Sequence, residues 1–101
     1  MKAVKSSGNV FLDLGFSPAE SRNLRMRSQM MTALRKLIEK GNLTQAEAAR
    51  QLKVTQPRIS DLMRGKISRF SLDTLVNMLA DAGVDVDVRI KAGPRSSQRV
   101  A

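Results

Sequence analysis

Cysteine, histidine, tryptophan and tyrosine are all absent from this chain of 101 residues. Without cysteine and histidine, disulfides, thiolate zinc sites and imidazole-assisted nucleophiles are excluded. The nine acidic residues form no close pair beyond the alternating Asp85 and Asp87, and no glycine-rich phosphate loop is present. We therefore expect a protein that is not an enzyme and that uses no cofactor and no metal.

Aromatic residues and long apolar runs are also scarce. Three phenylalanines are the whole aromatic set, and proteins that bind single-stranded nucleic acid usually stack bases on aromatic rings. No apolar run reaches the length of a membrane span, and the N-terminus lacks the apolar core of a secretory signal. The absence of cysteine permits a reducing compartment. These features favour a cytoplasmic protein without a membrane partner.

Positive charge is what the sequence has in excess. Eighteen lysines and arginines stand against nine acidic residues, which gives a net charge of +9. Residues 50–69 include six basic residues and one acidic residue. A polyanion is the natural partner of such a surface, so we expect double-stranded DNA as the partner and association with the nucleoid. The length and the 42% hydrophobic content suit one domain with a modest core.

Two short helices with their own start signals lie in and beside this basic stretch. Thr44 is followed three residues later by a glutamate, a spacing that predicts a capping box. A second helix is predicted after Thr55, with Pro57 in its first turn, where a missing amide hydrogen costs nothing. Only two residues remain to turn the chain between them. This arrangement predicts a helix-turn-helix, whose second helix enters the major groove of DNA.

Two further helices complete the predicted bundle. Ser17, followed by proline and glutamate, predicts a helix from Pro18 to Lys40. Three arginines on its first half are expected either to be solvated or to meet phosphate or a partner: Arg22, Arg25 and Arg27. Its expected core positions are Met30, Leu34, Leu37 and Ile38. Ser71 is expected to cap a last helix that stops at Gly83, with an apolar face of Leu72, Leu75, Val76, Leu79 and Ala80. The fold class expected is mainly α, a lambda-repressor-like helical bundle.

The N-terminal residues 10–16 alternate in polarity with one interruption. This pattern predicts a short strand or an extended segment that docks on a groove, with a lead-in that packs on the next helix as an equal alternative. Its candidates for binding a partner protein are Phe11, Leu12, Leu14 and Phe16. The polar segments 1–9 and 92–101 are predicted to be disordered, the second of them basic, so that 10–91 is the folded domain.

The clearest strand pattern runs from Val84 to Lys91. Its apolar positions, predicted to form a dimer interface, are Val84, Val86, Val88 and Ile90. A lone strand leaves its backbone groups unpaired, so the segment needs a partner strand. Antiparallel pairing with a second copy places the two aspartates of one strand near the two basic residues of the other. We therefore expect a homodimer, with an internal sheet to residues 10–16 as the alternative.

Packing Ile59, Leu62 and Met63 inward decides which residues the second short helix presents to DNA. The candidates for reading base edges are Gln56, Arg58, Ser60 and Arg64. The candidates for phosphate contacts stand at helix starts or are cations beside them: Thr44, Gln45, Lys53, Thr55, Lys66 and Arg69. Asp61 repels phosphate, so we expect it to face solvent or to pair within the protein.

Segment 43–79 resembles the phage-repressor-like helix-turn-helix family, the XRE or Cro/repressor type. The resemblance lies in its Leu-Thr-Gln-Ala-Glu-Ala-Ala start, in Ile59 and Leu62, and in the Arg-Gly-Lys that begins at Arg64. More narrowly, the phrases at 13–16, 56–62 and 70–75, followed by a valine-rich strand, are similar to HigA-type antitoxins. The resemblance implies a dimeric repressor that binds a palindromic operator ahead of its own operon and inactivates a cognate ribonuclease toxin. A stand-alone repressor of the same family is the alternative.

Two positions depart from that family pattern. Lys53 stands where the family usually has the glycine of the turn. Either this lysine accepts a positive φ at a cost of about 1 kcal/mol, or the turn is built differently. Pro57 stands where relatives of the broader family often carry a polar base reader, which shifts the expected readout to its neighbours.

Overall fold

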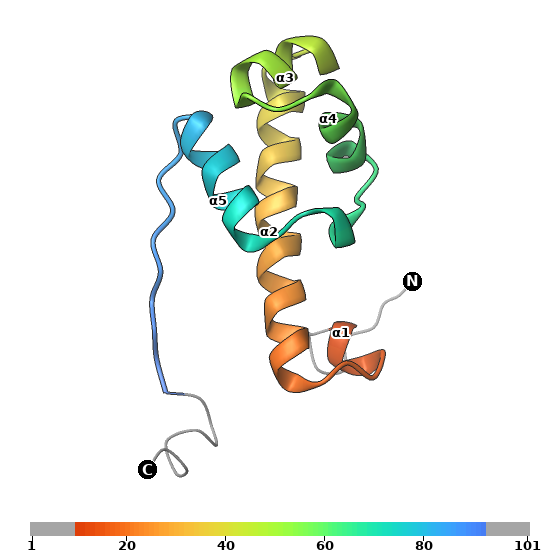
Figure 1. Ribbon diagram of the computed structural model, residues 1–101. Helices are drawn as coiled ribbons and strands as arrows, with labels where there is room; N and C mark the ends of the chain where they lie inside the picture. The colour runs from red at the N-terminus through yellow and green to blue at the C-terminus, as the bar shows by residue number, and fades with distance from the viewer. Residues whose placement is uncertain (1–9, 93–101) are drawn as a thin grey trace.

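The computed structural model describes residues 10–92, and in this range the chain forms five α-helices and one short 3-10 helix (Figure 1). Their bounds are α1 Val10–Asp13, α2 Pro18–Lys40, α3 Gln45–Leu52, α4 Gln56–Met63, η1 Ile67–Arg69 and α5 Leu72–Asp81. The long α2 is the axis of the molecule, with α1 at its N-terminal end and α4 and α5 packed along its remainder, while α3 packs on α4 and α5. None of the helices in this range is both long and apolar enough to cross a membrane.

The four predicted helix starts are confirmed. Ser17 and Thr44 each complete a capping box with the glutamate three residues on. Thr55 and Ser71 each accept a hydrogen bond from the amide three residues on. Because these side chains satisfy amides that have no partner inside the helix, the starts are determined within one turn of the chain.

Each of the five described α-helices is followed within two residues by one with positive φ: Gly15, Asn42, Lys53, Gly65 and Gly83. Lys53 has φ 59° and ψ 43°. Its amide donates to the Arg50 carbonyl, and the Val54 amide donates to the Ala49 carbonyl at 3.0 Å. These are the two hydrogen bonds of a Schellman ending. The first of the two alternatives for Lys53 is therefore confirmed, and this lysine occupies a left-handed conformation that a β-carbon disfavours by about 1 kcal/mol.

The core lies where α2, α3, α4 and α5 meet. It contains Met31, Leu34, Ile38, Ala48, Ala49, Leu52, Ile59, Leu62, Phe70, Leu75, Met78 and Leu79. The predicted contact of α3 with α4 is confirmed, and the small Ala48 allows their axes to approach closely. The predictions for Leu37 and Val76 are wrong, because these side chains are 39% and 38% exposed. The prediction for Ala80 is wrong as well, because this residue is exposed. At these positions the apolar arcs of α2 and α5 extend beyond the surface that their neighbours cover.

The N-terminal segment is helical, so the strand or extended segment predicted for residues 10–16 is wrong. The Phe16 amide donates to the Phe11 carbonyl at 3.1 Å, which folds the chain back after α1. The rings of Phe11 and Phe16 meet edge to face with centroids 6.2 Å apart. Packing of α1 on α2 confirms the alternative of a lead-in to the next helix. The alternative of an internal sheet between residues 10–16 and the predicted C-terminal strand is therefore wrong as well.

The C-terminal segment 84–92, which we call the arm, is assigned neither helix nor strand within the described range. It leaves α5 and runs in an extended path beside the bundle (Figure 1). Val84 and Val86 pack against the core, whereas Val88 and Ile90 are 80% and 90% exposed. Pairing of the predicted strand with a second copy stays a prediction. Apart from Ala92, the two predicted tails at 1–9 and 92–101 lie outside the described residues.

Candidate nucleic-acid interface

The outward side of α4 carries the residues predicted to read bases. Ile59 and Leu62 are fully buried toward the rest of the bundle. Gln56 and Arg64 are exposed, and Arg58 and Ser60 are half-buried. Because Pro57 has no amide hydrogen and the Arg58 amide bonds to the Thr55 hydroxyl at 3.3 Å, the first turn of α4 has few unpaired donors.

The two capping threonines can still contact phosphate. Thr44 accepts a hydrogen bond from the Glu47 amide at 3.1 Å, and Thr55 accepts one from the Arg58 amide. A hydroxyl that accepts in a cap keeps its own hydrogen as a donor. Both threonines are exposed, as is Gln45 beside Thr44. The predicted phosphate contacts at the starts of α3 and α4 are therefore accessible and chemically able to donate.

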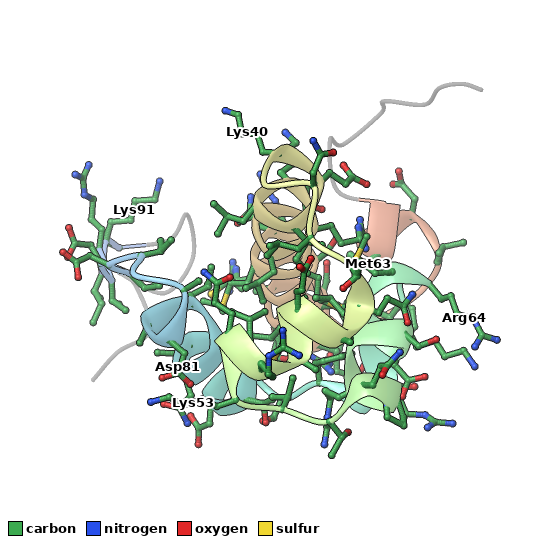
Figure 2. All side chains as sticks on the ribbon, turned by 90° about the horizontal axis from the view of Figure 1, so that it is seen from above. Lys40, Lys53, Met63, Arg64, Asp81 and Lys91 are labelled. Atoms are coloured by element: carbon green, nitrogen blue, oxygen red, sulfur yellow. The ribbon has the colours of Figure 1, made fainter. Side chains whose placement is uncertain are left out.

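The predicted cations flank the α3–α4 unit. Lys53 and Arg64 lie on opposite sides of it when seen from above, and Lys91 at the end of the arm lies away from both (Figure 2). Lys53 is largely exposed, with its Nζ 3.8 Å from a carboxylate oxygen of Asp81. Lys66 is half-buried after α4. A surface ion pair of this kind contributes at most about 1 kcal/mol, so Lys53 can exchange Asp81 for a phosphate.

Asp61 pairs within the protein, which confirms one of its two expected roles. Its Oδ2 lies 3.4 Å from Nη1 of Arg69. The carboxylate is therefore held beside a cation that was expected to contact phosphate. This pair reduces the repulsion between the Asp61 carboxylate and a DNA backbone, while the Arg69 side chain stays exposed.

The Arg58 side chain is half-buried and makes two contacts within the protein. Its Nη1 donates to the Arg69 carbonyl at 2.7 Å, and its Cζ lies 5.3 Å from the centroid of the Phe70 ring. Such a cation–π contact is worth about 1 kcal/mol at a partly exposed site. Binding a guanine edge would require both contacts to break. The geometry therefore favours a bracing role for Arg58 between α4 and the segment after it.

The comparisons with known proteins agree with this geometry. A family profile described as a helix-turn-helix domain matches residues 10–91. A solved structure described as an XRE-family transcriptional regulator matches with a TM-score of 0.69 and 32% sequence identity. The match covers 81% of this chain and 90% of that chain. The chain belongs to the XRE helix-turn-helix family. A comparison with curated proteins found no match for this XRE-family protein.

A second arginine brace was missed by the sequence analysis. Arg27 of α2 donates through Nη1 to the carbonyls of Ile67 and Phe70, at 3.1 and 3.0 Å. Its Nε donates to Asn23 at 2.7 Å. This XRE-family protein therefore holds the segment of η1 and Phe70 from two helices, by Arg27 of α2 and by Arg58 of α4. The sequence offers no signal for it, because the partners lie 40 and 43 residues away.

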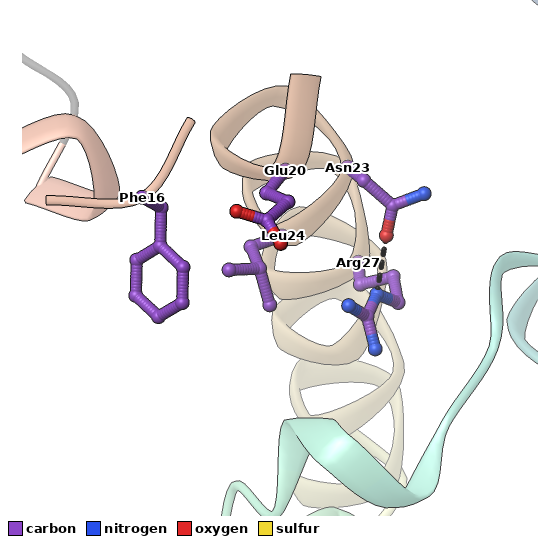
Figure 3. Close-up of a pocket in the computed structure, with 5 residues that line it drawn as sticks. All are labelled: Phe16, Glu20, Asn23, Leu24 and Arg27. Carbon is purple, nitrogen blue, oxygen red and sulfur yellow. Dashed lines mark hydrogen bonds between the residues drawn. The ribbon is translucent and has the colours of Figure 1, made fainter. Parts of the chain in front are cut away.

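The segment 10–16, which holds the candidates for partner binding, lies at the N-terminal end of α2, away from α3 and α4 (Figure 1). Leu14 and Phe16 are 71% and 41% exposed. Phe11 is half-buried, and Leu12 lies on α1. Phe16 borders an open hollow whose other wall is the first half of α2 (Figure 3). Its lining residues are Phe16, Glu20, Asn23, Leu24 and Arg27.

Across the described range, no group of three or more His, Cys, Asp and Glu side chains could hold a metal.

Proposed function

We propose that this XRE-family protein is a transcriptional repressor that binds an inverted-repeat operator as a homodimer. The observation that carries the proposal is the exposed side of α4, flanked by cations, on a chain with a net charge of +9. The similar structure described as a transcriptional regulator supports the same function. Repression then follows from the occupied operator excluding the transcription machinery, and it needs no catalytic group.

Base reading is proposed for the α4 side chains that are free to reach a groove. The Gln56 amide can bond both N6 and N7 of adenine, and the Arg64 guanidinium can bond O6 and N7 of guanine. Ser60 can serve several base edges. The phosphate contacts proposed beside them are Thr44, Gln45, Lys53, Thr55, Lys66 and Arg69. Two copies would bind half-sites about one helical turn apart.

The test is a fluorescence-anisotropy titration of the DNA upstream of this gene against scrambled DNA, at several salt concentrations. We expect tight binding to an inverted repeat and a steep loss of affinity with salt. Gln56→Ala should lower the preference for the operator by about ten-fold or more, whereas Gln29→Ala on the exposed side of α2 should not. Equal binding to operator and scrambled DNA, or affinity that ignores salt, would contradict the proposal.

A second proposed role is neutralisation of a toxin protein, as in the HigA-type antitoxins that the chain resembles. The exposed Leu14 and Phe16, beside an open hollow, support a protein partner at this end of α2. Co-expression with the product of the adjacent gene is the test. Wild type should rescue growth, and Leu14→Ser with Phe16→Ser should abolish rescue and leave operator binding intact. If the wild-type protein does not rescue growth, this result contradicts the antitoxin role and supports a stand-alone repressor.

A further inference from the structure

We infer that the arms of two copies pair as an antiparallel ribbon centred on Val88, so that Ile90 of each copy lies against the domain of the other. This inference rests on the homodimer of the proposed function and names its register. Three features support it: the unequal burial of the arm's apolar face, the order of its charges, and its fixed attachment to α5.

The apolar face of the arm is only half used within one chain. Val84 and Val86 pack against the core, whereas Val88 and Ile90 are 80% and 90% exposed. The bundle of the same chain does not cover these two, and the arm runs beside it in an extended path (Figure 1). Apolar side chains also remain half-exposed on the bundle, at Met26, Leu37 and Val76. The exposed half of the arm's apolar face is covered if a second arm lies beside the first.

The charges of the arm select one register. Any antiparallel pair centred between two residues would put apolar side chains opposite charged ones, because the two kinds alternate. Centring the pair on Asp87 or on Arg89 places that charged residue opposite the same residue of the second copy. Centring on Val86 puts Asp85 opposite Asp87, and centring on Ile90 puts Arg89 opposite Lys91. All four registers therefore bring like charges together.

Centring on Val88 leaves no like-charge contact. Asp87 then faces Arg89 of the second copy, and Asp85 faces Lys91. On the other face Val86 lies opposite Ile90, because side chains directly across an antiparallel pair share a face. Since Val86 packs against its own core, Ile90 of the second copy is brought to the margin of that core. A parallel in-register pair would instead set each charge against itself.

The attachment of the arm makes this register matter for DNA. The Val84 amide donates to the Leu79 carbonyl at 2.9 Å, so the arm leaves α5 in a fixed direction. A shift in register would move the two domains along the ribbon by about 3.3 Å for each residue. The register therefore sets the separation of the two α4 helices, and with it the spacing of the operator half-sites.

Disulfide trapping tests the register, because the chain has no cysteine of its own. In the ribbon the two Val88 Cα atoms lie about 4.5–5.5 Å apart, within the range of a disulfide. We expect full-length Val88→Cys to give a covalent dimer under mild oxidation. Val86→Cys alone and Ile90→Cys alone should not, since each residue is about 13 Å from its own copy. A mixture of the Val86→Cys and Ile90→Cys proteins should cross-link as a heterodimer.

A charge exchange gives an independent measurement. Asp87→Arg and Arg89→Asp should each raise the dimer dissociation constant by about ten-fold, because two symmetry-related pairs change together. The double variant with both substitutions should restore wild-type dimerisation. Additive losses in the double variant, or covalent dimers of Val86→Cys or Ile90→Cys alone, would overturn the register.

Failure of the inference can be told apart from failure of the proposed function. A wild-type protein that is dimeric by light scattering and binds the operator, but gives no Val88→Cys dimer, overturns the ribbon and leaves the repressor. A Val88→Cys dimer from a protein without operator preference overturns the repressor and leaves the ribbon. A monomeric wild type overturns the ribbon and the homodimer together.

Discussion

The guanidinium of Arg58 lies over the ring of Phe70, with Cζ 5.3 Å from the ring centroid, and Phe70 itself is buried in the core. An arginine of α4 is thereby joined to the segment that follows α4. Its hydrogen bond to the Arg69 carbonyl at 2.7 Å strengthens that connection. A residue whose position on the helix suggests base reading is thus used to fix the helix in place.

Removing this brace is expected to affect stability more than sequence preference. Arg58→Ala should lower the free energy of unfolding by about 1–2 kcal/mol, through loss of one hydrogen bond and the cation–π contact. Operator and scrambled DNA should both bind more weakly by similar factors. Urea denaturation and the two titrations measure these quantities. Unchanged stability with a ten-fold loss of operator preference would instead make Arg58 a base reader.

Arg27 is expected to contribute more to the free energy of unfolding than the exposed arginines beside it on α2. Arg27→Met removes the donors to the Ile67 and Phe70 carbonyls. Because hydrogen bonds from charged groups are worth about 1.5–3 kcal/mol, we expect a loss of about 2 kcal/mol in urea denaturation. Arg25→Met is the matched control, since Arg25 is exposed on the same helix. Equal losses in the two variants would show that the brace contributes nothing specific.

Glycine at position 53 is expected to stabilise the chain and weaken DNA binding. Lys53→Gly relieves the positive φ of 59° and should raise the free energy of unfolding by about 0.5–1 kcal/mol. The lost cation should reduce the salt slope of DNA binding by about one. Lys53→Ala is the control, because it loses the charge and keeps the strain. If thermal denaturation shows equal stability for Lys53→Gly and Lys53→Ala, position 53 carries no backbone strain and the prediction is wrong.

Acid should remove the contribution of Glu47 to stability. The Thr44 amide donates to the Glu47 carboxylate at 2.8 Å and lowers the pKa of Glu47 below its ordinary value of 4.5. A lowered pKa in the folded state gives stability that is full above that ordinary value and is lost as the pH falls through the folded value. Glu47→Gln should therefore be less stable than wild type at neutral pH, and the difference should shrink as the pH falls below 4.5. Denaturation at a series of pH values measures it, and a difference independent of pH would contradict this account.

Features that depend on a few neighbouring residues could be predicted from the sequence alone. The caps at Ser17, Thr44, Thr55 and Ser71 all use hydrogen bonds that span three residues. The short connection between α3 and α4 follows from the positions of two of these caps. The family resemblance adds to this, because its motifs lie mostly within the same two helices.

Features that depend on residues far apart along the chain could not be predicted from the sequence. The exposed Leu37 and the buried Phe70 have the same apolar character, and only the direction from which α5 and η1 approach decides which one is covered. The alternation in residues 10–16 suggests a strand, yet the segment begins with the helix α1, which packs against α2. Local pattern is weak evidence where one tertiary contact can outweigh it.

The amino acid order therefore specifies the helix-turn-helix, its capped boundaries and its excess of positive charge, since each of these comes from composition or from bonds within one helical turn. Three-dimensional packing specifies which cations remain free for DNA. Arg27 and Arg58 bind carbonyls 11 to 43 residues away, while Arg64 stays exposed. All three look alike in the sequence, because the carbonyls that occupy two of them come close only when the bundle closes.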